Sequence, residues 1–163
     1  MTLVSPAASR SALTSCVIVI VVSIAIAVWV GFGRVILGWP GSVGMVLSLT
    51  VVPIGLVLHG SAALQMRNAV RRGSSIRRAV IAFVLAASSG VLFGATVPEI
   101  TNEGIRSLMA PTGETWAVEM TIALCNPLGI VYLATSIATV VFARLAARGA
   151  SEPGVDAHEV GVG

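Results

Sequence analysis

The stretch "VPIGLVLHGS", Val52–Ser61, contains a proline, two glycines and a histidine, yet it lies inside the apolar run Val43–Met66. That run has the length of about 20 residues that a helix needs to cross a hydrocarbon core roughly 30 Å thick. Three further apolar runs reach this length, namely Leu13–Gly33, Ala79–Val97 and Ala117–Phe142. The sequence therefore predicts an all-α integral membrane protein with four transmembrane helices.

The amino-acid composition points to the same class. Of the 163 residues, 56% are hydrophobic and 10% are charged. A soluble domain carries about 25% charged residues, so this chain lacks the polar surface that a globule in water needs. All ten basic residues are arginines, and the chain is rich in Ala, Val and Gly, which favours a GC-rich bacterial genome. We expect a multi-pass protein of a bacterial plasma membrane.

The distribution of arginine predicts the orientation of the chain. The loop 67–78 holds five arginines, whereas the loop 98–116 holds three glutamates and one arginine. Arginine-rich loops stay in the cytoplasm, so both termini are expected there as well. This placement also explains the net charge of +3 without a nucleic-acid partner. The three tryptophans map to the opposite interface, in agreement with this orientation: Trp29, Trp39 and Trp116.

The segments outside the four spans are expected to be simple. Residues 1–12 are predicted to form a cytoplasmic N-terminal segment, and the Gly-rich, acidic tail 149–163 is predicted to be disordered. In the outer loop, four apolar residues suggest a short helix on the membrane surface: Ile100, Ile105, Leu108 and Met109. Glu99 is expected to be interfacial, and Arg34 is a basic residue on the outer side, in addition to Arg106 of the outer loop.

A weak internal repeat relates the second and fourth spans. The opening stretch resembles "NPLGIVYLAT", Asn126–Thr135, and an offset of 74 residues aligns Pro53 with Pro127 and Gly55 with Gly129. One hypothesis is that two tandem helical hairpins, in parallel orientation, are related by an axis along the membrane normal. The alternative is that apolar helices resemble one another by composition alone.

Each of these prolines is expected to kink its helix. A proline cannot donate a hydrogen bond to the carbonyl four residues back, which belongs to Leu49 for Pro53 and to Ala123 for Pro127. The freed carbonyls need new partners in lipid, and the hydroxyls of Thr50 and Thr121 are candidates. Paired interruptions of this kind mark binding sites in some transporters. The alternative is that membrane helices simply tolerate proline.

The third span carries small residues on one face. They recur every four positions, at Ala82, Ala86, Gly90 and Gly94. Such a face lets another helix approach closely. It is expected to pack inside the four-helix bundle, with a dimer contact as the alternative.

Three polar residues are candidates for chemistry inside the spans. His59 has Gly55 and Ala63 one helical turn away, so it is expected to face protein and not lipid. Under the repeat offset, Glu119 and Asn126 take positions that continue a line from His59 through the bundle. A polar track made of these three residues is one hypothesis. The alternatives are that His59 is a structural histidine and that Glu119 lies at the interface.

The packing signals outnumber the chemical ones. The sequence offers no nucleophile arrangement, no phosphate-binding loop and no metal-ligand spacing, so we expect no enzyme, no cofactor and no metal. The favoured function is a non-enzymatic accessory or structural subunit that acts through helix–helix contacts. Its expected partners are the lipid bilayer and either another membrane protein or further copies of itself. The alternative is a small transporter or channel, proton-linked through His59, that uses the Pro-x-Gly kinks.

Overall fold

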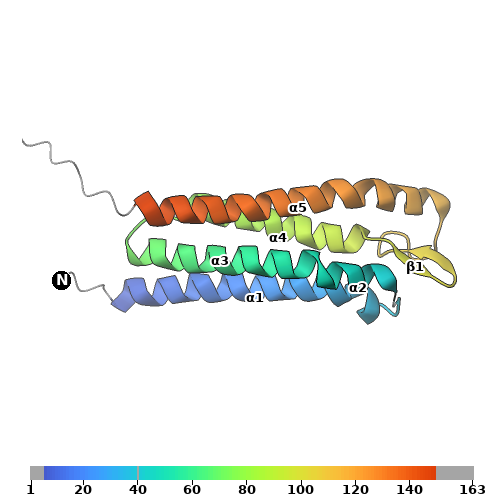
Figure 1. Ribbon diagram of the computed structural model, residues 1–163, viewed down its shortest axis with the longest axis horizontal. Coiled ribbons are helices and arrows are strands. Elements are labelled where there is room, and N and C mark those ends of the chain that lie inside the picture. Colours follow the sequence, from blue (N-terminus) through green and yellow to red (C-terminus); the bar gives the residue numbers. More distant parts are fainter. Residues whose placement is uncertain (1–5, 40, 150–163) are drawn as a thin grey trace, which may run out of the picture.

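The computed structural model describes residues 6–39 and 41–149, so residues 1–5 of the predicted segment 1–12 and residues 150–163 of the predicted tail lie outside the described residues. Five helices and a two-stranded hairpin follow one another along the chain (Figure 1). They are α1 (Pro6–Ile36), α2 (Ser42–Leu49), α3 (Val51–Arg71), α4 (Arg77–Thr96), β1 (Glu99–Thr101), β2 (Gly104–Arg106) and α5 (Thr115–Gly149).

The prediction of four helices long and apolar enough to cross a membrane is confirmed. These candidate spans are Ala12–Ile36, Ser42–Arg71, Arg77–Thr96 and Thr115–Gly149. The helices extend beyond the apolar runs, since α1 begins at Pro6 and α5 continues to Gly149. Polar residues at the ends of the runs therefore belong to the helices and not to the loops.

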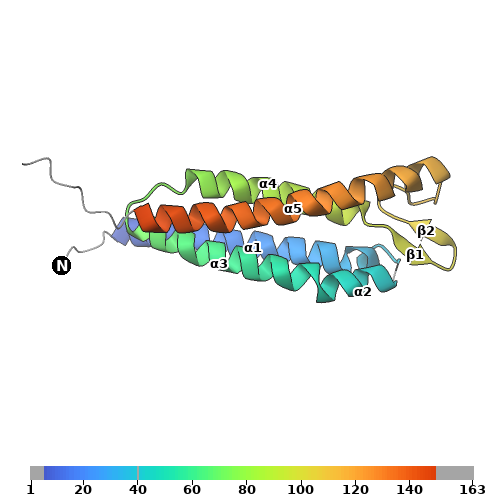
Figure 2. The same cartoon turned by 45° about the horizontal axis from the view of Figure 1, so that its top comes forward.

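The long helices form a ring in the order α1, α3, α5, α4, and each packs against its two neighbours (Figures 1 and 2). Thus α1 and α4, which run in the same direction, lie side by side, and so do α3 and α5. A twofold axis along the bundle would instead place α1 opposite α4 and α3 opposite α5. The hairpins α1–α3 and α4–α5 thus lie side by side in the same orientation. The predicted axis along the membrane normal is therefore wrong.

The second span is a broken helix. α2 ends at Leu49, and Thr50, with φ −115° and ψ −75°, separates it from α3. Pro53 is the third residue of α3. At that position a backbone N–H has no partner within its own helix, so proline is tolerated. The break lies at Leu49–Thr50, next to the carbonyl that Pro53 was expected to leave without a donor, but it separates two helices where a kink within one helix was expected.

The segment between α4 and α5 contains strands where a surface helix was expected. β1 and β2 pair antiparallel, with Glu99 opposite Arg106 and Thr101 opposite Gly104. Gly104 has φ +116°, a backbone conformation that glycine adopts without strain. The β-branched residues on both sides of this tight turn favour strands over a helix. The all-α prediction therefore holds for the spans but fails in this loop.

The small-residue face of α4 lies inside the bundle. A Cβ atom added to Gly90 would meet Ile26 of α1 at 2.9 Å and the ring of Tyr132 of α5 at 3.0 Å. At Gly94 it would meet Trp29 of α1, whose indole Nε1 donates a hydrogen bond to the carbonyl of Val91 at 3.0 Å. The four predicted packing residues are all buried: Ala82, Ala86, Gly90 and Gly94.

Candidate functional site

The predicted polar track is not assembled in the structure. His59 is 1% exposed and points into the bundle, whereas Asn126 and Glu119 are exposed on α5. Asn126 and Glu119 are seven residues apart, about two helical turns, so they share one face of the helix. The inward face of α5 is a different one, and it carries Thr121, Tyr132 and Ser136.

His59 is enclosed by side chains from α4 and α5. Its Nε2 lies 3.0 Å from Oγ of Ser136, and that hydroxyl in turn donates to the backbone carbonyl of Tyr132 at 2.7 Å. The rings of Phe83 and Tyr132 meet the imidazole edge-on, with centroids 5.3 and 6.0 Å away. Because Ser136 uses its proton on the carbonyl, it accepts from His59, which places a proton on Nε2. The imidazole is a hydrogen-bonded part of the core.

The two glycines of the Pro-x-Gly pattern each lie against an aromatic ring. A Cβ atom at Gly55 would collide with the hydroxyl of Tyr132, and one at Gly129 would lie 3.0 Å from the ring of Phe93. The rings of Phe93 and Tyr132 stack on each other, with centroids 6.5 Å apart. Both glycines therefore make room for a stacked aromatic pair between α3, α4 and α5.

The threonine hydroxyls beside the two prolines have other partners than expected. Thr50 Oγ1 donates to the carbonyl of Val46 at 2.7 Å, one turn earlier than predicted. Thr121 Oγ1 lies 3.0 Å from Oγ of Ser107, which belongs to the segment after β2. Neither hydroxyl bonds the carbonyl that the proline frees, so these predictions are wrong.

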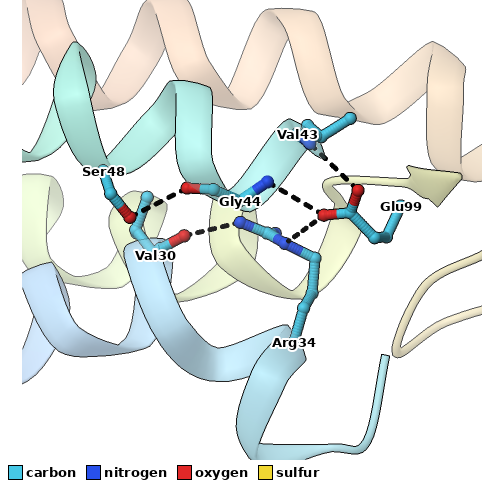
Figure 3. Close-up of polar contacts among 6 residues, drawn as sticks. All are labelled: Val30, Arg34, Val43, Gly44, Ser48 and Glu99. Atoms are coloured by element: carbon cyan, nitrogen blue, oxygen red, sulfur yellow. Dashed lines mark hydrogen bonds and ion pairs between the residues drawn. The ribbon is translucent and has the colours of Figure 1, made fainter. Parts of the chain in front are cut away.

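A buried polar cluster lies at the end of the bundle that carries the β1–β2 hairpin, hereafter the hairpin end. Glu99, the first residue of β1, is fully buried, and its carboxylate accepts hydrogen bonds from the backbone N–H groups of Val43 and Gly44 (Figure 3). Both bonds are 2.9 Å long. These amides open α2, whose N-cap residue Gly41 has no side chain to cap them. Glu99 supplies the cap from 55 residues away in the sequence.

The positive partner of Glu99 comes from the last turn of α1. The guanidinium of Arg34 is 3% exposed; its Nε lies 3.5 Å from Oε2 of Glu99, and its Nη2 donates to the carbonyl of Val30 at 2.6 Å (Figure 3). Within the described residues, Nε and Nη1 make no hydrogen bond. A buried ion pair with unsatisfied donors is costly to form, but removing one partner costs more, since the other charge then stays buried and unpaired.

Two glycines, Gly41 and Gly44, leave the space that the Glu99 carboxylate and the neighbouring backbone of α1 occupy. A Cβ atom at Gly41 would fall on the carboxylate of Glu99, and one at Gly44 would lie 3.3 Å from the carbonyl of Gly31 in α1. Ser48 donates to the carbonyl of Gly44 at 2.8 Å, within the second turn of α2 (Figure 3). The cluster thus joins α1, α2 and β1 at one point.

The sequence placed Glu99 at the interface but gave it no partner, whereas the structure buries it and pairs it with Arg34. Two signals could have identified the pair. Arg34 is a basic residue at the outer end of the first span, against the orientation rule, and Glu99 follows the third span as Arg34 follows the first. Spans one and three run in the same direction, so their ends meet at the same end of a bundle.

The outward face of α5 is the remaining candidate. Among the described residues, no group hydrogen-bonds the side chain of Asn126. Ala123, Ile130 and Ala134 are exposed on the same side of the helix. The result is a narrow stripe of small and apolar residues with one amide in it.

The described residues contain no group of three His, Cys, Asp or Glu side chains that could hold a metal ion. Comparisons of the chain with protein-family models, with curated proteins and with solved structures gave no match.

Proposed function

We propose that this protein is a four-span subunit of a bacterial plasma membrane, with both termini in the cytoplasm, that binds a helix of a partner membrane protein along α5. It performs no chemistry of its own. Four apolar helices and the arginine-rich loop 67–78 support the membrane placement.

The observation that carries the proposal is the exposed amide of Asn126. Trp116 marks the start of the apolar part of α5, and Asn126 lies ten residues further, about 15 Å along the axis. That is half of a hydrocarbon core roughly 30 Å thick. The amide would therefore face lipid at the centre of the bilayer.

An amide in that position favours a partner helix. Hydrocarbon offers no hydrogen bond, so an unpaired polar side chain is expensive there. Helix pairs in membranes form through small residues that permit close approach and through polar side chains that bond across the interface. The stripe of Ala123, Asn126 and Ala134 has both features.

The surroundings of His59 favour this function over transport. A proton carrier needs water or a second titratable group within reach. His59 instead bonds the hydroxyl of Ser136, and aromatic rings cover two of its sides. Asn126 and Glu119, the other members of the predicted track, lie on the outer surface.

The test is co-purification from cells that express the chain at its native level. We expect the wild-type protein in mild detergent to carry one stoichiometric second polypeptide. Asn126→Leu should weaken this association about threefold to tenfold, as expected for one interhelical hydrogen bond. Thr135→Val is the matched control, because the Thr135 hydroxyl already bonds the carbonyl of Val131 at 2.6 Å.

A photo-crosslinking residue incorporated into the chain identifies which helix face contacts the partner. Placed at Ile130, it should label the partner; placed at Val21 of α1, it should label lipid. A homo-oligomer without a second polypeptide, or labelling at Val21 alone, would contradict the accessory function.

A further inference from the structure

The charges of this molecule are divided between its two ends. The end opposite the hairpin, hereafter the basic end, carries Arg67, Arg71, Arg72, Arg77, Arg78, Arg144 and Arg148. The sequence has no Asp or Glu in residues 50–98 or 120–149, and the four described glutamates lie in β1 and in the segments that follow it up to Glu119. The described part of the basic end therefore attracts anions.

A cavity of about 370 Å³ opens at this end between α3 and α5. Its volume lies in the range of small-ligand sites. The lining is almost entirely polar: Gln65, Asn68, Arg72, Arg144, Ala147 and Arg148. Three guanidinium groups and two amides thus surround one small space.

One of these guanidinium groups is held in place. Arg72, which directly follows α3, donates from Nη1 to the carbonyl of Ala147 at 2.9 Å. That carbonyl belongs to the last turn of α5, where backbone acceptors lack helical partners. The bond ties the ends of α3 and α5 together and fixes Arg72 at the edge of the cavity, so less side-chain freedom is lost when an anion binds.

From this arrangement we propose that the cavity binds the phosphate headgroup of an anionic phospholipid. A guanidinium presents N–H donors in a planar fork that matches phosphate oxygens. The amides of Gln65 and Asn68 add donors for the phosphate or for hydroxyls of the headgroup. Basic pockets between membrane helices on the cytoplasmic side are suited to such headgroups.

The position of the cavity favours a lipid over a soluble anion. It lies where two apolar helices end, which is the headgroup level in the proposed membrane placement, and the inference rests on that placement. α3 also exposes Leu64, at 55%, one residue before Gln65 of the cavity lining, and its side chain can contact an acyl chain. A lipid therefore gains apolar contact that free phosphate lacks.

The experiment is a titration of the full-length chain in detergent with phosphatidylglycerol, followed by native mass spectrometry. We expect one retained lipid per chain, with at least tenfold lower affinity for phosphatidylcholine. The double variant R144Q/R148Q should lower the affinity about 30-fold, from the loss of two charges near the headgroup.

The double variant R77Q/R78Q is the matched control. These two arginines line a separate cavity of about 470 Å³ between the start of α4 and α5, so the variant removes the same charge from the same end. We expect it to lower the affinity less than about threefold. Equal losses in both variants would mean non-specific attraction to the basic end and would overturn the proposal.

Two further arms complete the test. Displacement of the lipid by millimolar inorganic phosphate would assign the cavity to a soluble anion and overturn the lipid assignment. If R144Q/R148Q does not fold, Q65L/N68L leaves the charge intact and should still weaken phosphatidylglycerol binding; unchanged binding would contradict the proposed site.

Discussion

Pro53 and Pro127 stand in the same Pro-x-Gly pattern, but the helices around them differ. Pro53 is the third residue of α3, after the break at Thr50, and at that position a backbone N–H has no helical acceptor to lose. Pro127 lies in the interior of α5, which continues through it from Thr115 to Gly149. The first proline costs its helix little, whereas the second removes a hydrogen bond.

Contacts from distant segments account for this difference. Glu99 holds the first amides of α2, and Tyr132 packs against Gly55 in α3, so the two parts of the second span are fixed separately. They meet at Thr50. No comparable anchor among the described residues divides α5. A proline permits a break, and tertiary contacts decide where the break forms.

The largest expected effect is at Glu99. Glu99→Gln leaves Arg34 buried without a counter-charge and weakens the cap of α2, so we expect the free energy of unfolding in detergent to fall by about 3–5 kcal/mol. Denaturant unfolding followed by circular dichroism measures this change. If the carboxylate fixes α2, hydrogen exchange should also rise in residues 42–50.

The control for this variant is Glu103→Gln. Glu103 pairs with Arg106 at 2.6 Å but is 76% exposed, so its loss should cost less than about 1 kcal/mol. The double variant R34M/E99Q should recover part of the lost stability, because it leaves no unpaired charge. A small effect of Glu99→Gln, similar to that of Glu103→Gln, would show that α2 is fixed by other contacts.

The next effect separates the two glycines of the pattern. Gly55→Ala places a methyl group on the hydroxyl of Tyr132, whose ring is held by Phe93, so we expect a loss of about 1–3 kcal/mol. At Gly129 the methyl group lies 3.0 Å from the edge of Phe93. That crowding is offset by the higher helix propensity of alanine, and the net change should stay within about 0.5 kcal/mol.

Tyr132→Phe removes the hydroxyl that Gly55→Ala meets. The double variant G55A/Y132F should therefore be less destabilised than the sum of the two single variants, as measured by a double-mutant cycle. If the losses of stability in the two single variants simply add, the loss caused by Gly55→Ala does not come from contact with the Tyr132 hydroxyl.

The smallest effect compares the prolines directly. Pro127→Ala restores a backbone donor for the carbonyl of Ala123 and should stabilise α5 by about 1 kcal/mol, less than in water because membrane helices partly re-satisfy freed carbonyls. Pro53→Ala should change stability by no more than about 0.5 kcal/mol. Thermal unfolding in one detergent measures both variants, and equal effects would contradict the distinction between the two sites.

The polar residues were predicted less well than the helices. A hydrophobic run identifies a span because each residue contributes independently of its neighbours in space. The side chains of Arg34 and Glu99 are 65 positions apart, and their pairing depends on which helix ends meet. His59 was correctly expected to face protein, but its bond to Ser136 depends on the contact between α3 and α5.

Local sequence was enough to predict four long apolar helices, because hydrophobic length and helical hydrogen bonding are local properties. It also determined, through small residues at four-residue spacing, that α4 has a face for close packing. The packing of the helices was needed to establish that α1 lies beside α4, that the second span breaks at Thr50, and that Glu99 caps α2. Those outcomes depend on which buried polar groups can reach one another, and a buried carboxylate takes its partners from whatever segments the packing brings within about 3 Å.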